Sequence, residues 1–305
     1  MSVVHFKQSS YEIESLKTRV QEGIILLGGW EKILNEKSSI LLKPNLVSSG
    51  PASQMHTTHP HIIIAVAQLL LDHGYKVGVA DSPGTGSAEH HLNQIGALDP
   101  LQNLGVDCFS FTSGRLIKSV DPRYKGLNMA KELDQWEGLI NLPKLKSHQQ
   151  TLFTGATKNL FGCLAGKRKA WAHMQSKDEL PSFMKMILTF ANEIHPDLHI
   201  ADGVVALHDG GPIHGKPFEL GSLLLSQDFL ELDLTFCKLI GLDPKDTPLF
   251  KVIEPYATAI PDPKILGDEL KKVTGFILPE LTSIRFNPLQ MLRSLLKALV
   301  AKVLK

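Results

Sequence analysis

The sequence predicts an α/β protein with a mainly parallel sheet flanked by helices, folded as one body or as two lobes. Strand-like apolar runs alternate with longer helical patterns through most of the chain. Polar residues gather where several predicted strands end, as they do at the ligand-binding edge of open α/β sheets. The chain of 305 residues is long enough for one large α/β domain or two small ones.

The first predicted unit is a strand, a helix and a second strand. Residues 39–42 form a short apolar run that a Lys-Pro-Asn turn ends, and a similar run covers 76–80. The helix between them covers 59–73 and is apolar nearly all round, so it is expected to be buried. Pro60 lies in its first turn, and Gly74 is placed to cap its C-terminus.

The alternation continues along the chain, with a less regular region over 110–131 that predicts an antiparallel excursion. A Gly- and His-rich loop is expected between Asp202 and Pro217. Asp228 and Glu231 have the spacing of a capping box, which predicts a helix start. The remaining predicted elements are helices over 87–95 and 180–194 and strands over 106–109, 139–142, 198–200 and 221–225.

The last segment, 286–305, predicts an amphipathic helix that follows an α/β domain over 1–285. Asn287 and Pro288 open this helix, and its apolar residues form one stripe while its basic residues face the other way. Such a helix most often covers the core of its own domain. A contact between two copies in a homodimer is the second interpretation, and a membrane-surface helix is the third.

Composition narrows the function classes. A net charge of +1 and an aromatic content of 7% argue against nucleic acid as a partner. The longest apolar runs are too short to span a bilayer, so membrane contact is not expected. The N-terminus has no basic segment followed by an apolar core, so a secretory signal is not expected either.

The three cysteines, Cys108, Cys163 and Cys237, are far apart and form no CxxC motif. The spacing gives no signature of a zinc ribbon or a self-contained ferredoxin-type cluster. A sparse, odd set of thiols is typical of reduced cysteines, which predicts a cytoplasmic protein.

Four polar clusters begin where predicted strands end: Lys43-Pro44-Asn45, Asp81-Ser82-Pro83-Gly84, Pro143 to His148, and Asp202-Gly203. Ligands of open α/β sheets bind in the crevice outside the carboxyl ends of the strands. If all four strands are parallel neighbours, the four clusters converge on one crevice. The sequence therefore predicts a ligand site there.

The segment from Pro143 to Gly162 carries the densest polar chemistry of the chain. A solvated basic loop would explain its lysines without any function. The alternative is an anion site, in which Gly155 lets backbone N–H groups face a carboxylate or phosphate and nearby lysines add charge. A lysine desolvated among other cations has a lowered pKa and can act as a base or nucleophile. We expect His148 and Lys158 to be the acid/base pair or the anchor of a cofactor.

Further residues are assigned to holding the ligand. The predicted anion-binding residues are Lys43, Asn45, Lys144, Lys146, Asn159, Lys167 and Arg168. The predicted cofactor contacts are Asp81, Ser82, Gly84, Asp202 and His208. For Asp81 the alternatives are a cation, a ribose hydroxyl, a lysine or the cap of the next helix, since no dinucleotide or Walker A fingerprint follows.

Three other motifs leave two interpretations each. His56, His59 and His61 have spacing that fits a metal site, although a polar helix start explains them equally. The run Lys167-Arg168-Lys169 predicts either a lid that closes on an anion or a solvated face. His208, Asp209 and His214 are candidate acid/base groups or metal ligands, or incidental polar residues of a Gly-Gly-Pro turn.

With these motifs in place, the chain resembles domain-of-unknown-function family 362 over nearly its whole length. The matching segments are KPNLV (43–47), the run from Thr57 to Gly84, INLPKLKSH (140–148), TGATKNLFG (154–162), IADGVVALHDGGPIHG (200–215), and the unit around Asp228 and Asp233. Many members carry a ferredoxin-like segment with Cys motifs. This sequence lacks those cysteines, which removes the simplest redox role that the resemblance implies.

A short stretch is also similar to lactate racemase-like proteins. In that family a His, a Gly-rich turn and a Lys ten residues on recur, and His148, Thr154-Gly155-Ala156 and Lys158 repeat the pattern here. The similarity implies an acid/base role for His148 and a Lys158 that tethers a nickel pincer cofactor.

Taken together, the sequence predicts an enzyme of isomerase, racemase-like or other acid–base type that acts on a small anionic molecule. Its cofactor is not identified, a divalent metal and a lysine-tethered group being the candidates. The alternative is a non-catalytic iron–sulfur-associated or metal-handling accessory protein, which would need a cluster shared between chains.

Overall fold

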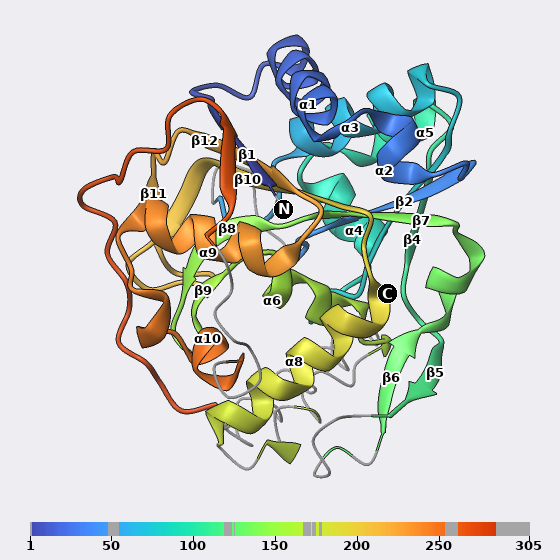
Figure 1. The fold of residues 1–305 in the computed structure, drawn as a ribbon. Coiled ribbons are helices and arrows are strands. Elements are labelled where there is room, and N and C mark those ends of the chain that lie inside the picture. Colours follow the sequence, from blue (N-terminus) through green and yellow to red (C-terminus); the bar gives the residue numbers. More distant parts are fainter. Residues whose placement is uncertain are drawn as a thin grey trace.

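The structure is a computed structural model that describes residues 2–47, 55–118, 124, 126–166, 172, 175–176, 179–253 and 262–284. An 11-stranded sheet runs through the centre in the order β13-β1-β12-β10-β7-β2-β3-β4, with β8, β9 and β11 attached beside it (Figure 1). Its strands are β1 (Ser2–Lys7), β2 (Ser39–Pro44), β3 (Lys76–Asp81), β4 (Asp107–Ser110), β7 (Gly138–Leu142), β8 (Lys144–His148), β9 (Leu152–Thr154), β10 (Leu198–His208), β11 (Lys216–Phe218), β12 (Ser222–Ser226) and β13 (Lys264–Gly267). A separate hairpin joins β5 (Gly114–Ile117) to β6 (Leu127–Ala130).

Five neighbouring strands, β10, β7, β2, β3 and β4, are all parallel, and β12 is antiparallel to both β10 and β1. The prediction of an α/β fold with a mainly parallel sheet is confirmed. The excursion predicted over 110–131 contains β5 and β6, which pair antiparallel.

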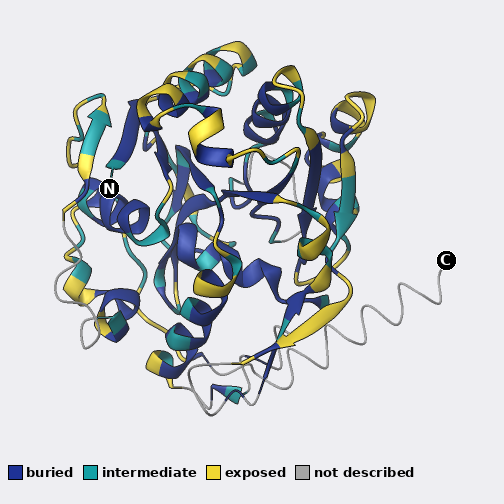
Figure 2. Cartoon of the chain, turned by 45° about the vertical axis from the view of Figure 1, so that its right-hand side comes forward, coloured by how far each residue is buried: buried dark blue, intermediate teal, exposed yellow. Residues whose placement is uncertain are grey.

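Helices cover both faces of the sheet. The helices are α1 (Ile13–Leu27), α2 (Trp30–Leu34), α3 (Pro60–Asp72), α4 (Ala88–Gln94), α5 (Leu98–Asn103), α6 (Ala156–Leu160), α8 (Leu180–Ile194), α9 (Phe229–Ile240) and α10 (Pro248–Ile253), with short 3-10 turns at Lys131–Gln135, Phe161–Cys163 and Pro244–Asp246. Apolar residues of α1 to α5 form one core cluster on one face, and those of α6, α8, α9 and α10 form a second on the other (Figure 1). Figure 2 shows the central strands buried, with exposed residues on the outer surfaces of the helices.

The order of the strands reverses between β2 and β7. From β2 the chain passes through α3 to β3 on one side, whereas β7 lies on the other side of β2 and leads through α6 and α8 to β10. Ligands of open α/β sheets bind at such a switch point, outside the carboxyl ends of the two strands. Here those ends carry Lys43, Pro44 and Leu142.

Two predicted loops are strands in the structure. Lys144–His148, expected as a polar loop, is the fully buried strand β8, which pairs with β10 and β9. The strand predicted to end at Ile200 continues to His208 as β10, and β11 begins at Lys216, inside the expected Gly- and His-rich loop. The reason is pairing with strands remote in sequence, which local polarity does not reveal.

No helix within the described part of the chain is long and apolar enough to cross a membrane. Two predictions fall on residues that the structure does not describe: the amphipathic helix over 286–305, and the basic run that contains Lys167 and Arg168.

Candidate functional site

Three lysines lie fully buried at the carboxyl ends of β2 and β7. Lys43 is on β2, and Lys144 and Lys146 are on β8, which follows β7 directly. Their side chains are 0%, 0% and 1% exposed. Burial of even one ammonium group costs several kcal/mol unless it is paired, so each lysine must be stabilised by specific neighbours.

Lys43 and Lys144 each have a carboxylate partner. Lys43 Nζ lies 2.8 Å from Asp81 Oδ1, and Lys144 Nζ lies 2.7 Å from Asp202 Oδ2. Asp81 also accepts the backbone N–H groups of Ser82 and Leu46. Of the partners open to Asp81 in the sequence, the structure shows a lysine, and Ser87 rather than Asp81 caps α4.

Lys146 differs from these two because, within the part of the chain that the structure describes, no carboxylate bonds to it. Its Nζ donates to Asn45 Oδ1 at 2.8 Å and to the carbonyl of His56 at 2.5 Å, and both acceptors are neutral. Burial lowers the pKa of Lys146 well below its usual range, and the positive charges of Lys158 and Lys144 lower it further. Of the three buried lysines, Lys146 is therefore the one whose charged form the surrounding residues stabilise least.

A chain of amides leads away from Lys146. Asn45 Nδ2 donates to Asn159 Oδ1 at 2.7 Å, and Asn159 Nδ2 donates to Asn141 Oδ1 at 2.8 Å. Asn141 Nδ2 then contacts His199 Nδ1 at 3.0 Å. All the donors point the same way, so His199 Nδ1 accepts and its proton lies on Nε2. Burial lowers the pKa of His199 to about 3, which keeps this imidazole neutral.

Tyr11, in the loop before α1, closes the other side of the site. Its hydroxyl donates to Asp202 Oδ1 at 2.9 Å and accepts from Lys144 Nζ and from the N–H of Val205, both at 3.0 Å. Its ring stacks on His59, with 3.6 Å between the ring centroids. Sequence reasoning missed Tyr11 because a lone tyrosine before a helix carries no motif.

Removing this hydroxyl is expected to weaken the fold measurably. Tyr11→Phe keeps the stacked ring but removes three hydrogen bonds, those of the hydroxyl with Val205 N–H, Lys144 and Asp202. We therefore expect a loss of about 1–3 kcal/mol in the free energy of unfolding. Urea unfolding measures it. Tyr75→Phe is the matched control, since the hydroxyl of Tyr75 makes no hydrogen bond among the described residues; a loss of equal size there would contradict the role of the Tyr11 hydroxyl.

The start of α6 is already occupied by a side chain. Asp233 of α9 accepts the N–H groups of Ala156 and Thr157 at 2.6 and 3.1 Å, and a Cβ on Gly155 would overlap its carboxylate. The prediction that these N–H groups face a ligand is therefore wrong for this structure. Gly155 is required by the close approach of Asp233 instead.

Asp233 and His199 are expected to make opposite contributions to stability as pH changes. Burial raises the pKa of Asp233 to about 7 and lowers that of His199 to about 3. Between about pH 4 and 7 the folded protein keeps a proton on Asp233 that the unfolded chain releases, so this group lowers stability as pH rises. Between about pH 3 and 6.5 the unfolded chain protonates His199 and the folded protein does not, so this group raises stability as pH rises.

The single variants separate the two effects. Asp233→Asn should leave a protein whose free energy of unfolding falls on acidification from pH 6.5 to 4, because His199 remains. His59 acts in the same direction, since burial lowers its pKa to about 4. His199→Gln should reduce that acid sensitivity and expose the loss that Asp233 causes as pH rises to 7. Urea unfolding at a series of pH values checks both, and parallel curves for the two variants would contradict the assignment.

The predicted pair His148 and Lys158 sits beside this cluster. Lys144, Lys146 and His148 alternate along β8, so their side chains share one face of the strand. His148 is 7% exposed, and its Nδ1 accepts the N–H of Gln150. The β8–β9 hairpin pairs Lys146 with Thr154 and so returns the chain to α6, where Lys158 lies over the rings of Phe161 and Phe183.

Other predicted residues are only partly brought together. Ser82 is buried and donates to the carbonyl of Gly166, whereas Gly84 is exposed beside it. His208 lies at the far end of β10, against Phe218 and Phe276, and accepts the N–H of Ile277. The sequence therefore places His208 with the wrong group of residues.

The three histidines near α3 have separate partners. His59 caps the helix by accepting the N–H of His61, the His61 ring contacts the carbonyl of Tyr11, and the His56 carbonyl accepts from Lys146. Across the described ranges, no three His, Cys, Asp or Glu side chains are placed to hold a metal ion. The polar helix start is the interpretation that these contacts support.

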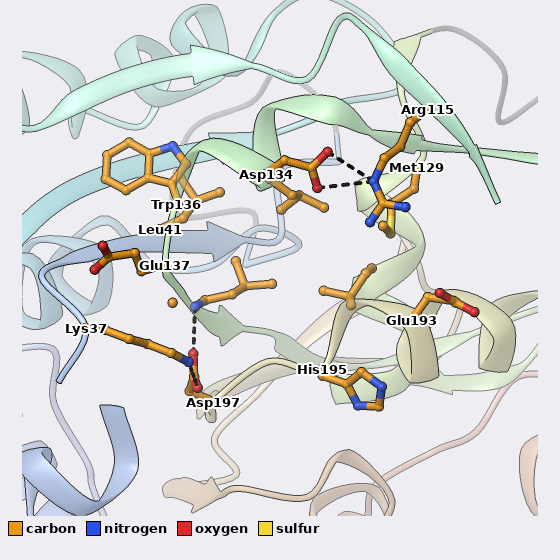
Figure 3. A pocket seen from close by; sticks show the side chains of 14 residues that line it. Lys37, Leu41, Arg115, Met129, Asp134, Trp136, Glu137, Glu193, His195 and Asp197 are labelled. Atoms are coloured by element: carbon orange, nitrogen blue, oxygen red, sulfur yellow. Dashed lines mark hydrogen bonds and ion pairs between the residues drawn. The ribbon is translucent and has the colours of Figure 1, made fainter. Parts of the chain in front are cut away.

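A pocket of about 140 Å³ lies at the opposite edge of the sheet, where β2, β7 and β10 begin (Figure 3). Its charged groups are largely paired, Lys37 with Asp197 and Arg115 with Asp134 at 3.1 Å. Because this edge is the amino end of the parallel strands, it is not where open α/β sheets place their ligands. We therefore place the candidate site at the lysine cluster.

Comparison with known proteins identifies the family. The family described as Domain of unknown function (DUF362) matches residues 40–238, and the chain belongs to it. The thylakoid-associated protein sll1697 of a Synechocystis strain is 36% identical over 310 residues, which cover 100% of this chain and 96% of that protein.

Two solved structures share the fold. The lactate racemase apoprotein of Thermoanaerobacterium thermosaccharolyticum has a TM-score of 0.53 at 12% identity, over 78% of this chain and 56% of that one. A Thermotoga maritima protein from a structural genomics programme has a TM-score of 0.51 at 11% identity, over 77% of this chain and 60% of that one. This chain thus spans less than two thirds of either protein, and the likeness shows a common fold.

Proposed function

We propose that this protein is an enzyme that binds a small substrate through its carboxylate or phosphate group at the carboxyl ends of β2 and β7. The observation that carries the proposal is Lys146, a fully buried lysine that lies among further lysines and bonds no carboxylate of the described residues. An anion beside Nζ would supply the missing countercharge. The position at the switch point of the sheet supports the same location.

The chemistry we propose is acid–base catalysis by lysine and histidine. A desolvated lysine surrounded by positive charge has a lowered pKa, so it gives up its proton more readily than an exposed lysine and can serve as a base. His148 shares the face of β8 with Lys146 and is the second candidate for proton transfer, and Lys158 remains the proposed partner or cofactor anchor. The fold that the chain shares with a lactate racemase apoprotein agrees with chemistry of this type.

Anion binding tests the proposal directly. Inorganic phosphate and glycolate should each raise the melting temperature of the protein in a saturable way, and chloride at equal ionic strength should not. Lys146→Gln should abolish the effect, while Lys245→Gln, at an exposed lysine in the Pro244–Asp246 turn, should leave it unchanged. Failure of both anions to stabilise the wild-type protein beyond chloride would refute an anion site here.

A cofactor tethered to Lys158 is tested separately, because the proposed acid–base chemistry does not depend on it. Mass spectrometry of the denatured protein, purified without oxygen, should show a mass excess on Lys158 if that lysine anchors a group. A clean mass would refute the anchor but leave the anion site in place. The cytoplasmic location proposed from the sparse thiols is tested separately by cell fractionation.

The accessory-protein alternative depends on the cysteines. Cys163 and Cys237 pack into two different apolar clusters, and Cys108 borders a third. Burial raises the pKa of Cys108 to about 11 and that of Cys237 well above its usual range, so both thiols stay protonated and are poor metal ligands. Replacing all three cysteines should therefore leave anion binding intact.

A further inference from the structure

A second cavity, of about 350 Å³, lies where β1 ends and β12 begins, and it shares no residue with the lysine cluster. β1 and β12 lie side by side and form its floor (Figure 1). The end of α9 contributes Leu239 to one wall, and the segment 269–273, which follows β13, forms another. A cavity of this size can hold a small molecule.

Two buried polar side chains, His5 and Ser222, belong to the cavity floor, and each is 2% exposed. His5 Nδ1 lies 3.2 Å from the carbonyl oxygen of Asp268, and His5 Nε2 lies 3.2 Å from Ser222 Oγ. Ser222 Oγ lies 3.2 Å from the carbonyl oxygen of Leu220. Because both carbonyls can only accept, the three contacts need three protons. Neutral imidazole and the hydroxyl supply two, whereas imidazolium and the hydroxyl supply three.

The hydrogen-bond geometry therefore suits a charged His5, but its surroundings oppose the charge. Burial lowers the pKa of His5, and Lys7 lowers it further, whereas Asp268 raises it. The Asp268 carboxylate already accepts the backbone N–H of Lys7 at 2.8 Å. An anion in the cavity would stabilise the imidazolium that the three contacts suit.

The other lining groups match an anion with an apolar body. Lys271 pairs with Glu269 at 3.0 Å, whereas the side chains of Lys7 and Lys272 pair with no carboxylate among the described residues. The cavity thus has positive charge in excess on one side of the buried floor. Its apolar lining consists of Leu220, Leu239 and Val273.

We propose that this cavity is a binding site for a small carboxylic acid with an apolar body. The carboxylate lies against Lys7, Lys272 and the Ser222–His5 pair, and the apolar body packs on the two leucines and the valine of the lining. The site is separate from the lysine cluster and does not depend on anion binding there.

Benzoate is a suitable probe because it joins a carboxylate to an apolar ring, and benzamide has nearly the same shape without the charge. Benzoate should raise the melting temperature in a saturable way, and benzamide should not. The double variant Lys7→Gln, Lys272→Gln should weaken benzoate binding about tenfold or more, because it removes both unpaired cations. Lys245→Gln, at an exposed lysine outside the cavity, should leave it unchanged.

Photolabelling with 4-azidobenzoate locates the bound acid. After illumination, peptide mapping should find the label within residues 5–9, 220–222 or 269–273, and an excess of benzoate should prevent the labelling. Label confined to the segments of the lysine cluster, or label that benzoate does not displace, would overturn the inference.

Benzoate binding should also add a proton to His5, so its affinity should rise as the pH falls from about 7.5 to 5.5, by at most about tenfold per unit. Benzoate keeps its charge in this range, and lysine and carboxyl side chains ordinarily titrate outside it. His5→Gln should abolish the dependence, and a wild-type affinity that does not change with pH would contradict the contact with His5. The charged groups around His5 are Lys7, Asp268, Glu269, Lys271 and Lys272.

The two sites are separable by their variants. Lys146→Gln should abolish stabilisation by phosphate and glycolate but leave benzoate binding unchanged. Equal stabilisation of the wild-type protein by benzoate and benzamide, or equal benzoate affinity of the wild type and the double variant, would overturn the benzoate site. Neither result would affect the proposed anion site at the lysine cluster.

Discussion

Replacing Lys144 by methionine is expected to lower the free energy of unfolding by about 3–5 kcal/mol. The methionine fills most of the space but leaves Asp202, which is fully buried, without its cation. Asp202, on β10, also accepts from Tyr11 and from the N–H of His59, the N-cap of α3. Loss of the Lys144 charge therefore affects β10 and the segments before α1 and α3 together. Urea unfolding of the purified variant measures the effect.

A second ion pair of similar length provides the control. Lys216 and Asp209 lie 2.8 Å apart, but their side chains are 74% and 38% exposed. Exposed pairs contribute about 0–1 kcal/mol, so Lys216→Met should be nearly neutral. The double variant Lys144→Met, Asp202→Asn should recover part of the stability lost in Lys144→Met, because it removes the uncompensated charge. Equal losses for Lys144→Met and Lys216→Met would show that burial of the pair has no energetic consequence.

Gly162→Ala is the second substitution with a large expected effect. A Cβ at this position would overlap both Lys43 Nζ and Asp81 Oδ1, the two atoms of the other buried ion pair. Either the pair separates or the turn at Phe161–Cys163 shifts, and both outcomes remove stabilisation from a buried charge. We expect a loss of about 3 kcal/mol or more, together with loss of anion-dependent stabilisation.

Gly84→Ala is the control for this change. No heavy atom lies within 4 Å of a Cβ built on Gly84, and this glycine is not among those with a positive φ. Its substitution should change the unfolding free energy by less than about 0.5 kcal/mol. If Gly162→Ala proved as mild as Gly84→Ala, the tight packing around Lys43 and Asp81 would not be needed for stability.

The site was only partly visible in the sequence. The rule that polar residues after parallel strands meet at one edge led to Lys43, Asp81, Lys144, Lys146 and Asp202, which the structure brings together. It could not assign partners, because pairing depends on the order of strands in the sheet. The rule also led to His208, whose strand continues past the site to an aromatic cluster.

Three neighbours of the candidate site, Tyr11, Asp233 and His199, were not predicted to lie there. Tyr11 and Asp233 lie in sequence far from the lysine motif, and His199 stands inside an apolar strand. Each reaches the site through tertiary contacts: Tyr11 at Asp202, Asp233 at the start of α6, and His199 at Asn141. A buried histidine in a strand is the one local clue that would have justified attention, because it needs a hydrogen-bond partner.

The sequence by itself determined the class of fold and the chemical types at the carboxyl edge of the sheet. Hydrophobic periodicity and strand-end polarity depend on residues that are close together in the sequence, so they can be recognised without the structure. The tertiary structure alone decided which of the buried lysines pair with an aspartate and which one bonds no carboxylate among the described residues. That outcome depends on burial and on distances between strands that are remote in the chain, and these arise only when the sheet is assembled.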